Sequence, residues 1–366
     1  MSRAVVVPAD AGDAVLPSDF APLLIEWQRR AGRSGLPWQH TRDPYLVWLS
    51  EVMLQQTQVS SVLSYYPRFL ARCPDVQALA SASSDEVMAL WSGLGYYSRA
   101  RNLHRCAQVV VRDHGGVFPR TAEGLQTLPG IGASTAAAIA AFCYGERISI
   151  LDGNVRRVLS RLLAFEGDLA QQGPQRELWS LAQGLLPVGP TLDDMTAYTQ
   201  GLMDLGATVC ARSKPTCDRC PVRPICQAHA TEQTQRFPIK TRRLVRRFEN
   251  WWLLVVRDAS DAAQPRFWLE RRPSSGIWAG LYCPPVYADE AALLAALPES
   301  LRGRLEALEP VAHSLTHREL RLHPLLLQLP AGRVQPLPPG QWVNASDLAA
   351  HGLPAPVRLL LQSLSH

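Results

Sequence analysis

The 366-residue sequence lacks any charge-free apolar run long enough to cross a bilayer. Its first 18 residues carry one basic residue, two prolines and acidic side chains, which excludes a secretory signal and a membrane anchor. Cysteine is scarce, with eight residues in the chain. Four of them, Cys73, Cys106, Cys143 and Cys283, are scattered along the sequence, which is typical of free thiols in a reducing compartment. The sequence therefore predicts a cytoplasmic protein with a disordered tail over residues 1–17.

The chain is long enough for two domains, and its composition, 47% hydrophobic and 19% charged, is typical of a soluble globular protein. A net charge of only +5 permits a nucleic-acid partner without requiring one. Apolar residues recur every three or four positions over residues 18–230, and Asp43-Pro44 is a strong helix start. Residues 18–230 are therefore predicted to be all-helical.

The pattern changes after residue 230. Residues 231–247 are rich in arginine and poor in apolar periodicity, which predicts a basic interdomain linker. Residues 248–366 are predicted to form a small α+β domain. In it we expect strands at 251–256 and 267–269, a helix at 289–297 and a strand pair within 311–329.

The other four cysteines lie within 17 residues, in the spacing C-x6-C-x2-C-x5-C, at Cys210, Cys217, Cys220 and Cys226. Thiols so close together indicate ligands of one soft metal centre. The uneven spacing suits an iron–sulfur cluster, and a structural zinc site is the alternative. Arg212 and Lys214 lie between the first two cysteines. They form either a phosphate-binding loop or an ordinary charged surface loop.

The segment LPGIG, residues 128–132, precedes an alanine-rich run that strongly favours a helix. Gly130 and Gly132 allow the backbone to present its N–H groups at the positive end of that helix. A DNA phosphate can bind there without a basic side chain, which is the helix–hairpin–helix arrangement. A simple connection between two helices is the alternative.

Two carboxylates stand out. Glu51 lies within an apolar helical stretch, where burial raises the pKa of a carboxyl group and lets it act as a general acid. Asp152 precedes a helix, where a carboxylate tends to stay ionised. One protonated and one ionised carboxyl group can cleave a glycosidic bond. The alternatives are an exposed Glu51 and an Asp152 that only caps its helix.

In this order, the segments VWLSEVMLQQTQV, GLGYYSRARNL, LPGIGASTAAAI and LDGNVRRVL and the cysteine loop resemble the endonuclease III superfamily. Within it they are most similar to the A/G-specific adenine DNA glycosylase (MutY) family. The resemblance covers about residues 20–230 closely, and the C-terminal half resembles a MutT-like (Nudix-fold) domain. It implies a monomeric helix-hairpin-helix glycosylase with one 4Fe–4S cluster. The implied partner is double-stranded DNA that carries adenine opposite 8-oxoguanine or guanine.

The resemblance also implies roles for single residues. It assigns Glu51 to protonation of adenine N7, and Asp152, with its neighbour Asn154, to stabilisation of the cationic sugar. It places Gln56 in the duplex beside the extruded base and Tyr96 against the lesion as an aromatic wedge. Further expected DNA contacts are Arg99, Arg101, Gly130, Gly132, Ser134, Arg212 and Lys214, and the expected adenine pocket contains Leu36 and Trp38. A tyrosine packed under the next helix is the alternative for Tyr96.

Ser134 distinguishes this chain from bifunctional relatives, which resemble it but carry lysine there. A serine has no amine for a Schiff base, so the resemblance implies a monofunctional enzyme that leaves an abasic site.

The C-terminal domain resembles a Nudix fold without its acidic box, because only Asp289 and Glu290 follow Gly280 closely. No Mg²⁺ site for pyrophosphate hydrolysis is therefore expected. Residues 315–317 match a Phe-Ser-His loop that senses 8-oxoguanine, here as Leu315, Thr316 and His317. Surface histidines on neighbouring strands are the alternative.

Three other functions are weighed. A pyrimidine glycosylase lacks the long C-terminal domain. A non-catalytic DNA-binding protein is disfavoured by Glu51 and Asp152 together. A pyrophosphohydrolase is disfavoured by the missing acidic box.

Overall fold

The structure is a computed structural model that describes residues 16–241, 245–258, 260, 264–329 and 339–365. Most of the expected tail (residues 1–15) and part of the expected linker (residues 242–244) lie outside the described residues. The chain forms two compact units, and each is treated separately below. Unit 1 is Met1–Gln56 with Val109–Arg243, and unit 2 is Thr57–Gln108 with Leu244–His366. Unit 2 thus combines part of the helical sequence with the C-terminal sequence, a grouping that the sequence analysis did not anticipate.

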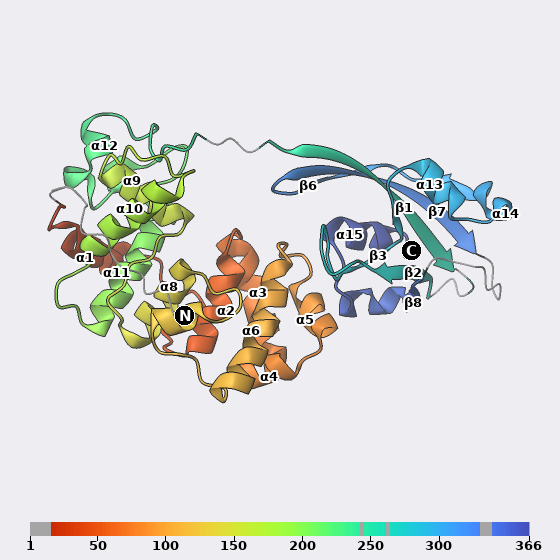
Figure 1. Ribbon diagram of the computed structural model, residues 1–366, viewed down its shortest axis with the longest axis horizontal. Coiled ribbons are helices and arrows are strands. Elements are labelled where there is room, and N and C mark those ends of the chain that lie inside the picture. Colours follow the sequence, from red (N-terminus) through yellow and green to blue (C-terminus); the bar gives the residue numbers. More distant parts are fainter. Residues whose placement is uncertain (1–15, 242–244, 259, 261–263, 330–338, 366) are drawn as a thin grey trace. The chain divides into compact units, whose positions relative to one another are not determined.

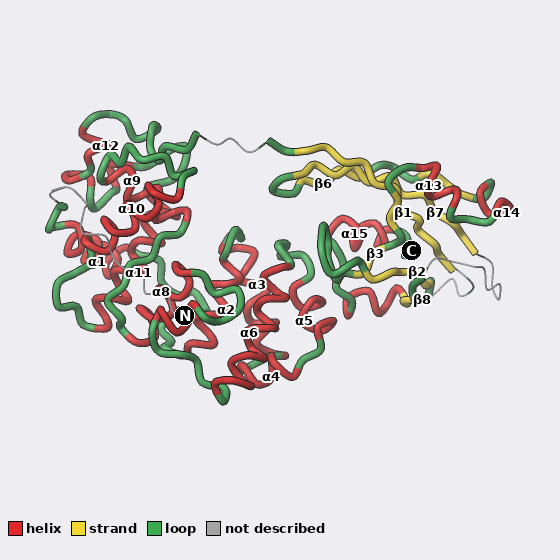
Figure 2. Tube along the Cα trace, in the orientation of Figure 1, coloured by secondary structure: helices red, strands yellow, loops and turns green. Residues whose placement is uncertain are grey.

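Unit 1 is helical (Figures 1 and 2). Its longer helices are α1 (Phe20–Ala31), α2 (Pro44–Leu54), α8 (Ala133–Tyr144), α9 (Gly153–Leu162), α10 (Gln172–Gly184) and α11 (Leu192–Asp204). The shorter ones are α7 (Ala122–Gln126), a π-helix (Leu205–Val209), two 3-10 helices (Cys217–Arg219 and Arg223–Ile225) and α12 (Gln227–Ala230). No helix of the described residues combines the length and apolar character that a membrane crossing needs.

Local chemistry explains where these helices begin. The Asp43 side chain accepts a hydrogen bond from the Tyr45 backbone N–H, and Pro44 occupies the first helical position of α2, as the sequence predicted. Helix α8 is alanine-rich and deeply buried, and both α2 and α11 pack against it. Because alanine side chains are small, helices can approach α8 closely, and this packing sets α2 beside the start of α8.

The helices of unit 2 are α3 (Val59–Arg72), α4 (Val76–Ser81), α5 (Ser84–Trp91) and α6 (Ser98–His114) up to Gln108. Its C-terminal part has strands β1 (Arg247–Asp258), β2 (Arg266–Arg271), β3 (Tyr282–Cys283), β4 (Val286–Tyr287), β5 (Leu305–Ala307), β6 (Val311–Ser314), β7 (Arg318–Leu329) and β8 (Gln341–Asn344). The helices of this part are α13 (Glu290–Ala295), α14 (Glu299–Arg302), a 3-10 helix (Ala345–Ala350) and α15 (Ala355–Ser363). The strands and the helix predicted for this region are confirmed.

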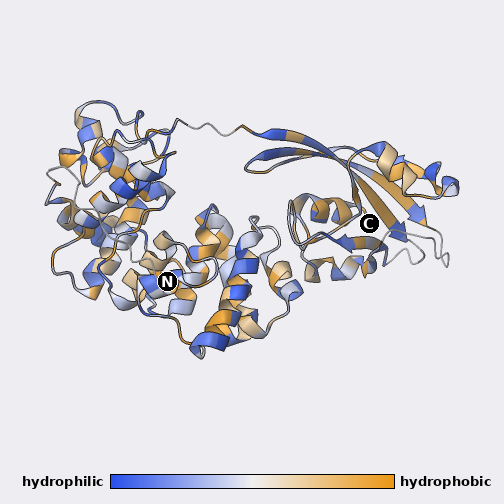
Figure 3. Ribbon diagram, viewed as in Figure 1, coloured by the Kyte–Doolittle hydropathy of each residue, from blue (hydrophilic) through white to orange (hydrophobic). Residues whose placement is uncertain are grey.

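The sheet of unit 2 has the order β3-β2-β1-β7-β5, and the two long strands β1 and β7 run parallel along their full length. The first residues of β1 are largely exposed, whereas Leu253–Val256 are buried, and Figure 3 shows the corresponding change in hydropathy along β1. A core containing Leu254, Leu327 and Leu293 of α13 lies on one face of this sheet. All-helical and α+β parts are therefore both present, as predicted.

The described part of the expected linker packs on unit 1. The Leu169 N–H donates to the Ile239 carbonyl oxygen at 3.0 Å, and Arg236 forms an ion pair with Glu166. Residues up to Thr241 are therefore fastened to unit 1 instead of forming a free spacer.

Candidate functional site

Glu51 is half-buried in α2, next to the buried Val52 and Met53. Burial raises the pKa of Glu51 from 4.5 to about 8, and the negative charge of Asp152 adds to this rise. The carboxyl group therefore holds its proton at neutral pH. A carboxylic acid in this state is able to donate that proton as a general acid.

Asp152 caps α9. Its Oδ1 accepts a hydrogen bond of 2.7 Å from the Val155 backbone N–H. The capping role that the sequence left as an alternative is thus present, but a residue that caps a helix can also act as a catalytic carboxylate. Because the charge of Asp152 acts on Glu51, the two carboxyl groups share one region of unit 1.

Ser134 lies in the first turn of α8 and fastens the segment before Asp152. Its Oγ accepts a hydrogen bond of 3.1 Å from the Leu151 backbone N–H. In the hairpin before α8, Gly130 has a φ of +78°, a conformation that glycine adopts at low cost. Gly132 is the N-cap of α8 and has no side-chain cap among the described residues. The first N–H groups of α8 therefore receive no hydrogen bond from a capping side chain, and the phosphate site at this helix start stays a prediction.

Arg157 links α9 to the cysteine segment. Its guanidinium donates to the Asn154 Oδ1 at 3.0 Å, to the Gly206 carbonyl at 2.7 Å and to the Cys210 carbonyl at 2.8 Å. Burial lowers the pKa of Arg157. Arg157 therefore connects Asn154, the expected neighbour of Asp152, with the backbone of the first cysteine.

All four cysteines line one small cavity, together with Arg161, Pro215 and Arg223 among others. The buried Arg161 donates to the Cys210 Sγ at 3.4 Å and to the carbonyl oxygens of Ala211 and Arg212. Within the described ranges, no group of three or more His, Cys, Asp or Glu side chains is arranged to hold a metal ion. Four thiols beside a buried cation nevertheless form a donor set that suits an anionic thiolate cluster. Arg212 and Lys214 are exposed on the loop that follows Cys210.

The segment 33–42 carries the two expected pocket residues, Leu36, which is half-buried, and Trp38, which is buried. At one end, the Arg33 Nε lies 2.6 Å from the Oδ1 of the fully buried Asp204, and the Arg33 backbone N–H donates to its Oδ2. At the other end, Arg42 pairs with Asp193 at 2.8 Å. This segment is therefore pinned to both ends of α11.

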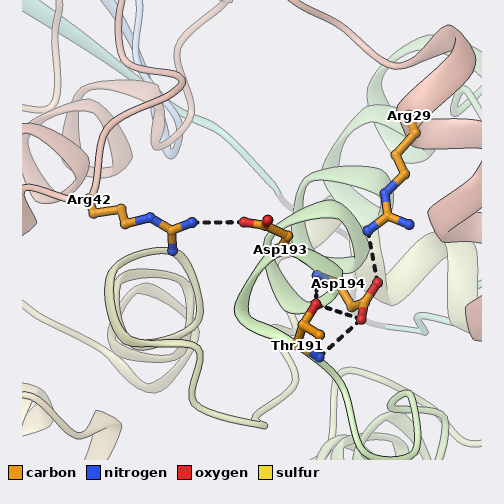
Figure 4. A network of polar contacts seen from close by, with 5 residues as sticks. All are labelled: Arg29, Arg42, Thr191, Asp193 and Asp194. Carbon is orange, nitrogen blue, oxygen red and sulfur yellow. Dashed lines mark hydrogen bonds and ion pairs between the residues drawn. The ribbon is translucent and has the colours of Figure 1, made fainter.

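Figure 4 shows the second of these attachments. Asp193 and Asp194 project from the first turn of α11, and Arg42 and Arg29 reach them from other parts of unit 1. Thr191 and Asp194 form a reciprocal capping box there. The Arg33–Asp204 pair was missed in the sequence, although Asp204 is a lone carboxylate in the apolar run GLMDLG, the same signal that singled out Glu51.

In unit 2, Tyr96 ends a tight turn. Gly93 and Gly95 have φ angles of +106° and +73°, and Tyr96 itself has +48°. A positive φ is unfavourable for a tyrosine and persists only where the surroundings enforce it. Tyr96 is 42% exposed, so it is not packed under the next helix. Gln56, at the end of unit 1, is also exposed and has a φ of +55°.

Arg99 and Arg101 are occupied by backbone contacts within unit 2. Arg99 is 7% exposed and donates to the carbonyl oxygens of Leu94 and Gly95, and its guanidinium lies 5.4 Å from the Tyr96 ring centre. Arg101 donates to the Ala279 carbonyl at 2.8 Å. In this structure Arg99 therefore supports the turn, and the half-buried Arg101 contacts the C-terminal part.

Leu315, Thr316 and His317 form the turn between β6 and β7. The Leu315 N–H donates to the Arg318 carbonyl at 2.7 Å and closes this turn. The Thr316 Oγ1 lies 3.0 Å from the Tyr96 Oη, so the two expected lesion-contacting residues are hydrogen-bonded to each other. His317 is exposed, whereas His323 stacks on Trp252. Asp289 caps α13, which places one of the two carboxylates after Gly280 in a structural role.

Residues 49–183 match the HhH-GPD superfamily base excision DNA repair protein family, and residues 253–363 match the NUDIX domain family. The chain is 32% identical to the adenine DNA glycosylase of Buchnera aphidicola, over 94% of this chain and 97% of that one. It is 36% identical to the adenine DNA glycosylase of Mus musculus, over 89% and 74%. A thermostable thymine-DNA glycosylase structure aligns with a TM-score of 0.51 and 28% identity, over 58% of this chain and 95% of that one.

Proposed function

Because the chain belongs to the adenine DNA glycosylase family, we propose that it is the monofunctional enzyme that removes adenine paired with 8-oxoguanine or guanine in double-stranded DNA. The family makes it a DNA glycosylase of base excision repair, which hydrolyses an N-glycosyl bond. The thymine-DNA glycosylase leaves 42% of this chain unmatched, which supports the adenine-specific assignment over a pyrimidine-specific one.

The observation that carries the proposal is that Glu51, whose pKa is raised to about 8 by burial, feels the charge of Asp152 at the capped start of α9. Glu51 donates its proton to N7 of the extruded adenine, and the bond from C1′ to N9 breaks with its electrons passing to the base. The oxocarbenium-like sugar faces the carboxylate of Asp152, which stabilises its positive charge. The ionised Glu51 then accepts a proton from water as the water oxygen bonds to C1′. The products are free adenine and an abasic site.

Ser134 supports the absence of strand cleavage. Its hydroxyl is engaged with the Leu151 N–H and offers no amine. The chain has lysine only at Lys214 and Lys240, near the cysteines and in the segment before unit 2. An amine for a Schiff base to the sugar is therefore absent from α8 and α9.

Cys210, Cys217, Cys220 and Cys226 are proposed to hold one 4Fe–4S cluster. When bound, the cluster supplies a rigid crosslink that shapes the basic loop. Arg161 offsets the negative charge of the thiolates. Arg212 and Lys214 then contact DNA phosphates, and the start of α8, at Gly130, Gly132 and Ser134, binds another phosphate.

Tyr96 and Gln56 are proposed to enter the duplex, since both project from strained backbone and are exposed. Arg99 and Arg101 are assigned to positioning of this region instead of phosphate contact. Leu36 and Trp38 form walls of the adenine pocket. Thr316, with Leu315 and His317, reads 8-oxoguanine on the opposite strand, and the protein acts as a monomer.

The test is a single-turnover incubation with a labelled duplex that holds one A:8-oxoguanine pair. We expect breakage of the adenine strand only after hot alkali. Asp152→Asn should lower the rate constant by roughly 100-fold or more with little change in DNA affinity, because asparagine keeps the helix cap but removes the charge. Asp75→Asn is the matched control, since Asp75 caps α4 in the same way.

Two outcomes would contradict the proposal. Breakage without alkali would show lyase activity and refute the assignment of Ser134. Activity of Asp152→Asn within a few-fold of wild type would leave Asp152 with its capping role alone.

A further inference from the structure

The turn of residues 92–96 has a strained backbone, so contacts from other parts of unit 2 are needed to hold its conformation. Three of its five residues, Gly93, Gly95 and Tyr96, have a positive φ, and one of the three is not a glycine. A non-glycine residue keeps such a conformation only if neighbouring groups over-determine it. Arg99 supplies part of that support from α6. Further contacts come from Tyr65 of α3 and from the C-terminal part of the chain.

Those contacts converge on Ser92, which is 2% exposed. The Ser92 Oγ donates to the Leu353 carbonyl at 2.8 Å, and the Tyr97 Oη donates to the same carbonyl at 3.2 Å. The Arg358 Nη1, from α15, donates to the Ser92 carbonyl at 3.1 Å. Residues 353–358 thus bind Ser92 twice: they accept a hydrogen bond from its hydroxyl and donate one to its carbonyl.

Gly93 shows how tightly this grip closes. A Cβ atom added at Gly93 would lie 2.2 Å from the Tyr65 Oη and 2.6 Å from the Arg358 Nη2. Tyr65 itself donates to the Ser92 carbonyl at 2.9 Å. Arg358 and Tyr65 therefore close over the glycine at the point where the turn adopts its left-handed conformation.

We propose that Arg358 is a positioning residue for Tyr96. By binding the Ser92 carbonyl beside Gly93, α15 holds the turn in the conformation that projects the tyrosine ring. Insertion of Tyr96 into DNA then depends on the last helix of the chain, which is remote from Tyr96 in sequence. This inference rests on the proposed function of Tyr96 as a wedge. It adds a residue of the C-terminal part that touches no DNA yet determines how the wedge is presented.

The test is a double-mutant cycle read by equilibrium binding to a duplex with an A:8-oxoguanine pair. Arg358→Met keeps the stem but loses the donors, and we expect it to weaken binding by about tenfold. The same substitution in a Tyr96→Ala background should cause no further loss. Arg358→Lys, which keeps one donor, should restore part of the affinity. The matched control is Arg302→Met, at an exposed arginine of α14, which should leave affinity unchanged.

Equal losses from Arg358→Met with and without Tyr96 would overturn the proposal, because Arg358 would then act elsewhere. An unchanged affinity for Arg358→Met would overturn it too, as would an unaffected Tyr96→Ala. If Arg358→Met folds poorly by circular dichroism, Ser92→Ala removes the other contact between this turn and residues 353–358, the hydrogen bond from the Ser92 Oγ to the Leu353 carbonyl, and should show the same dependence on Tyr96. Since binding is measured apart from base release, a wild type that binds but frees no adenine refutes the proposed function alone.

Discussion

At the scale of single residues, the raised pKa of Glu51 ties activity to pH. In the proposed mechanism base release requires the protonated form of Glu51, and burial raises the pKa of this group to about 8. The single-turnover rate constant should therefore be level near neutrality and fall about tenfold per pH unit above about 8. A rate constant that stays level up to pH 9.5 would show that Glu51 is not the acid.

Glu51→Gln is the control for this profile, and it also checks the sign of the pKa shift. Between pH 4.5 and about 8 the folded state binds the Glu51 proton more tightly than the unfolded state, so its contribution to stability is lost as pH rises through this window. Glutamine does not ionise. The variant should thus be inactive yet melt a few degrees higher than wild type at pH 8, and the difference should shrink at pH 5.

The role of a single residue could be predicted where its signal lies in the neighbouring sequence, and could not where it depends on contacts that only the fold brings about. Glu51 and Asp152 were visible because each has a local signal, a carboxylate in an apolar helix and a carboxylate before a helix. That Asp152 both caps α9 and acts on Glu51 required the structure. The burial of Arg99 was not predictable, since its partners at Leu94 and Gly95 accept through backbone atoms, which leave no trace in residue identity.

At the scale of elements, helix starts were predictable because their chemistry is local. Asp43-Pro44 and Asp152 each cap the helix that follows, as short-range rules require. The π-helix Leu205–Val209 was not predictable, since its apolar sequence suits an α-helix equally well. The segment 33–42 also has no regular pattern, and long-range ion pairs hold it.

Those ion pairs differ in burial, which leads to a prediction. Arg33→Met leaves Asp204 fully buried without its guanidinium and should lower the free energy of unfolding by about 3–5 kcal/mol. Arg42→Met breaks an exposed pair and should cost less than about 1 kcal/mol. Urea unfolding of the two variants measures both values. Equal losses would mean that Gln200, which already donates to the Asp204 Oδ1 at 2.8 Å, satisfies the buried carboxylate without Arg33.

At the scale of the whole molecule, the all-helical and α+β sequence regions were recognised correctly, but the compact units were not. Periodicity reports which residues form helices and strands, and it is blind to which helices pack together. Residues 57–108 read as part of one continuous helical domain, yet they form a compact unit with the C-terminal part. The contacts responsible, such as Ser92 with Leu353, join residues far apart in sequence.

The cysteine segment connects these scales, because one metal centre would organise the loop, the start of α9 and the DNA contacts together. We expect about four irons per chain in the purified protein, and Cys217→Ser should lose them together with DNA affinity, since the basic loop loses its crosslink. The matched control is Cys283→Ser, at a buried free thiol of β3, which should keep its iron. Elemental analysis with a binding titration measures both quantities.

One zinc per chain would replace the cluster by a structural zinc site. Full affinity in an iron-free Cys217→Ser would show instead that Arg157 and Arg161, through their bonds to Cys210 and Ala211, are sufficient to shape the loop.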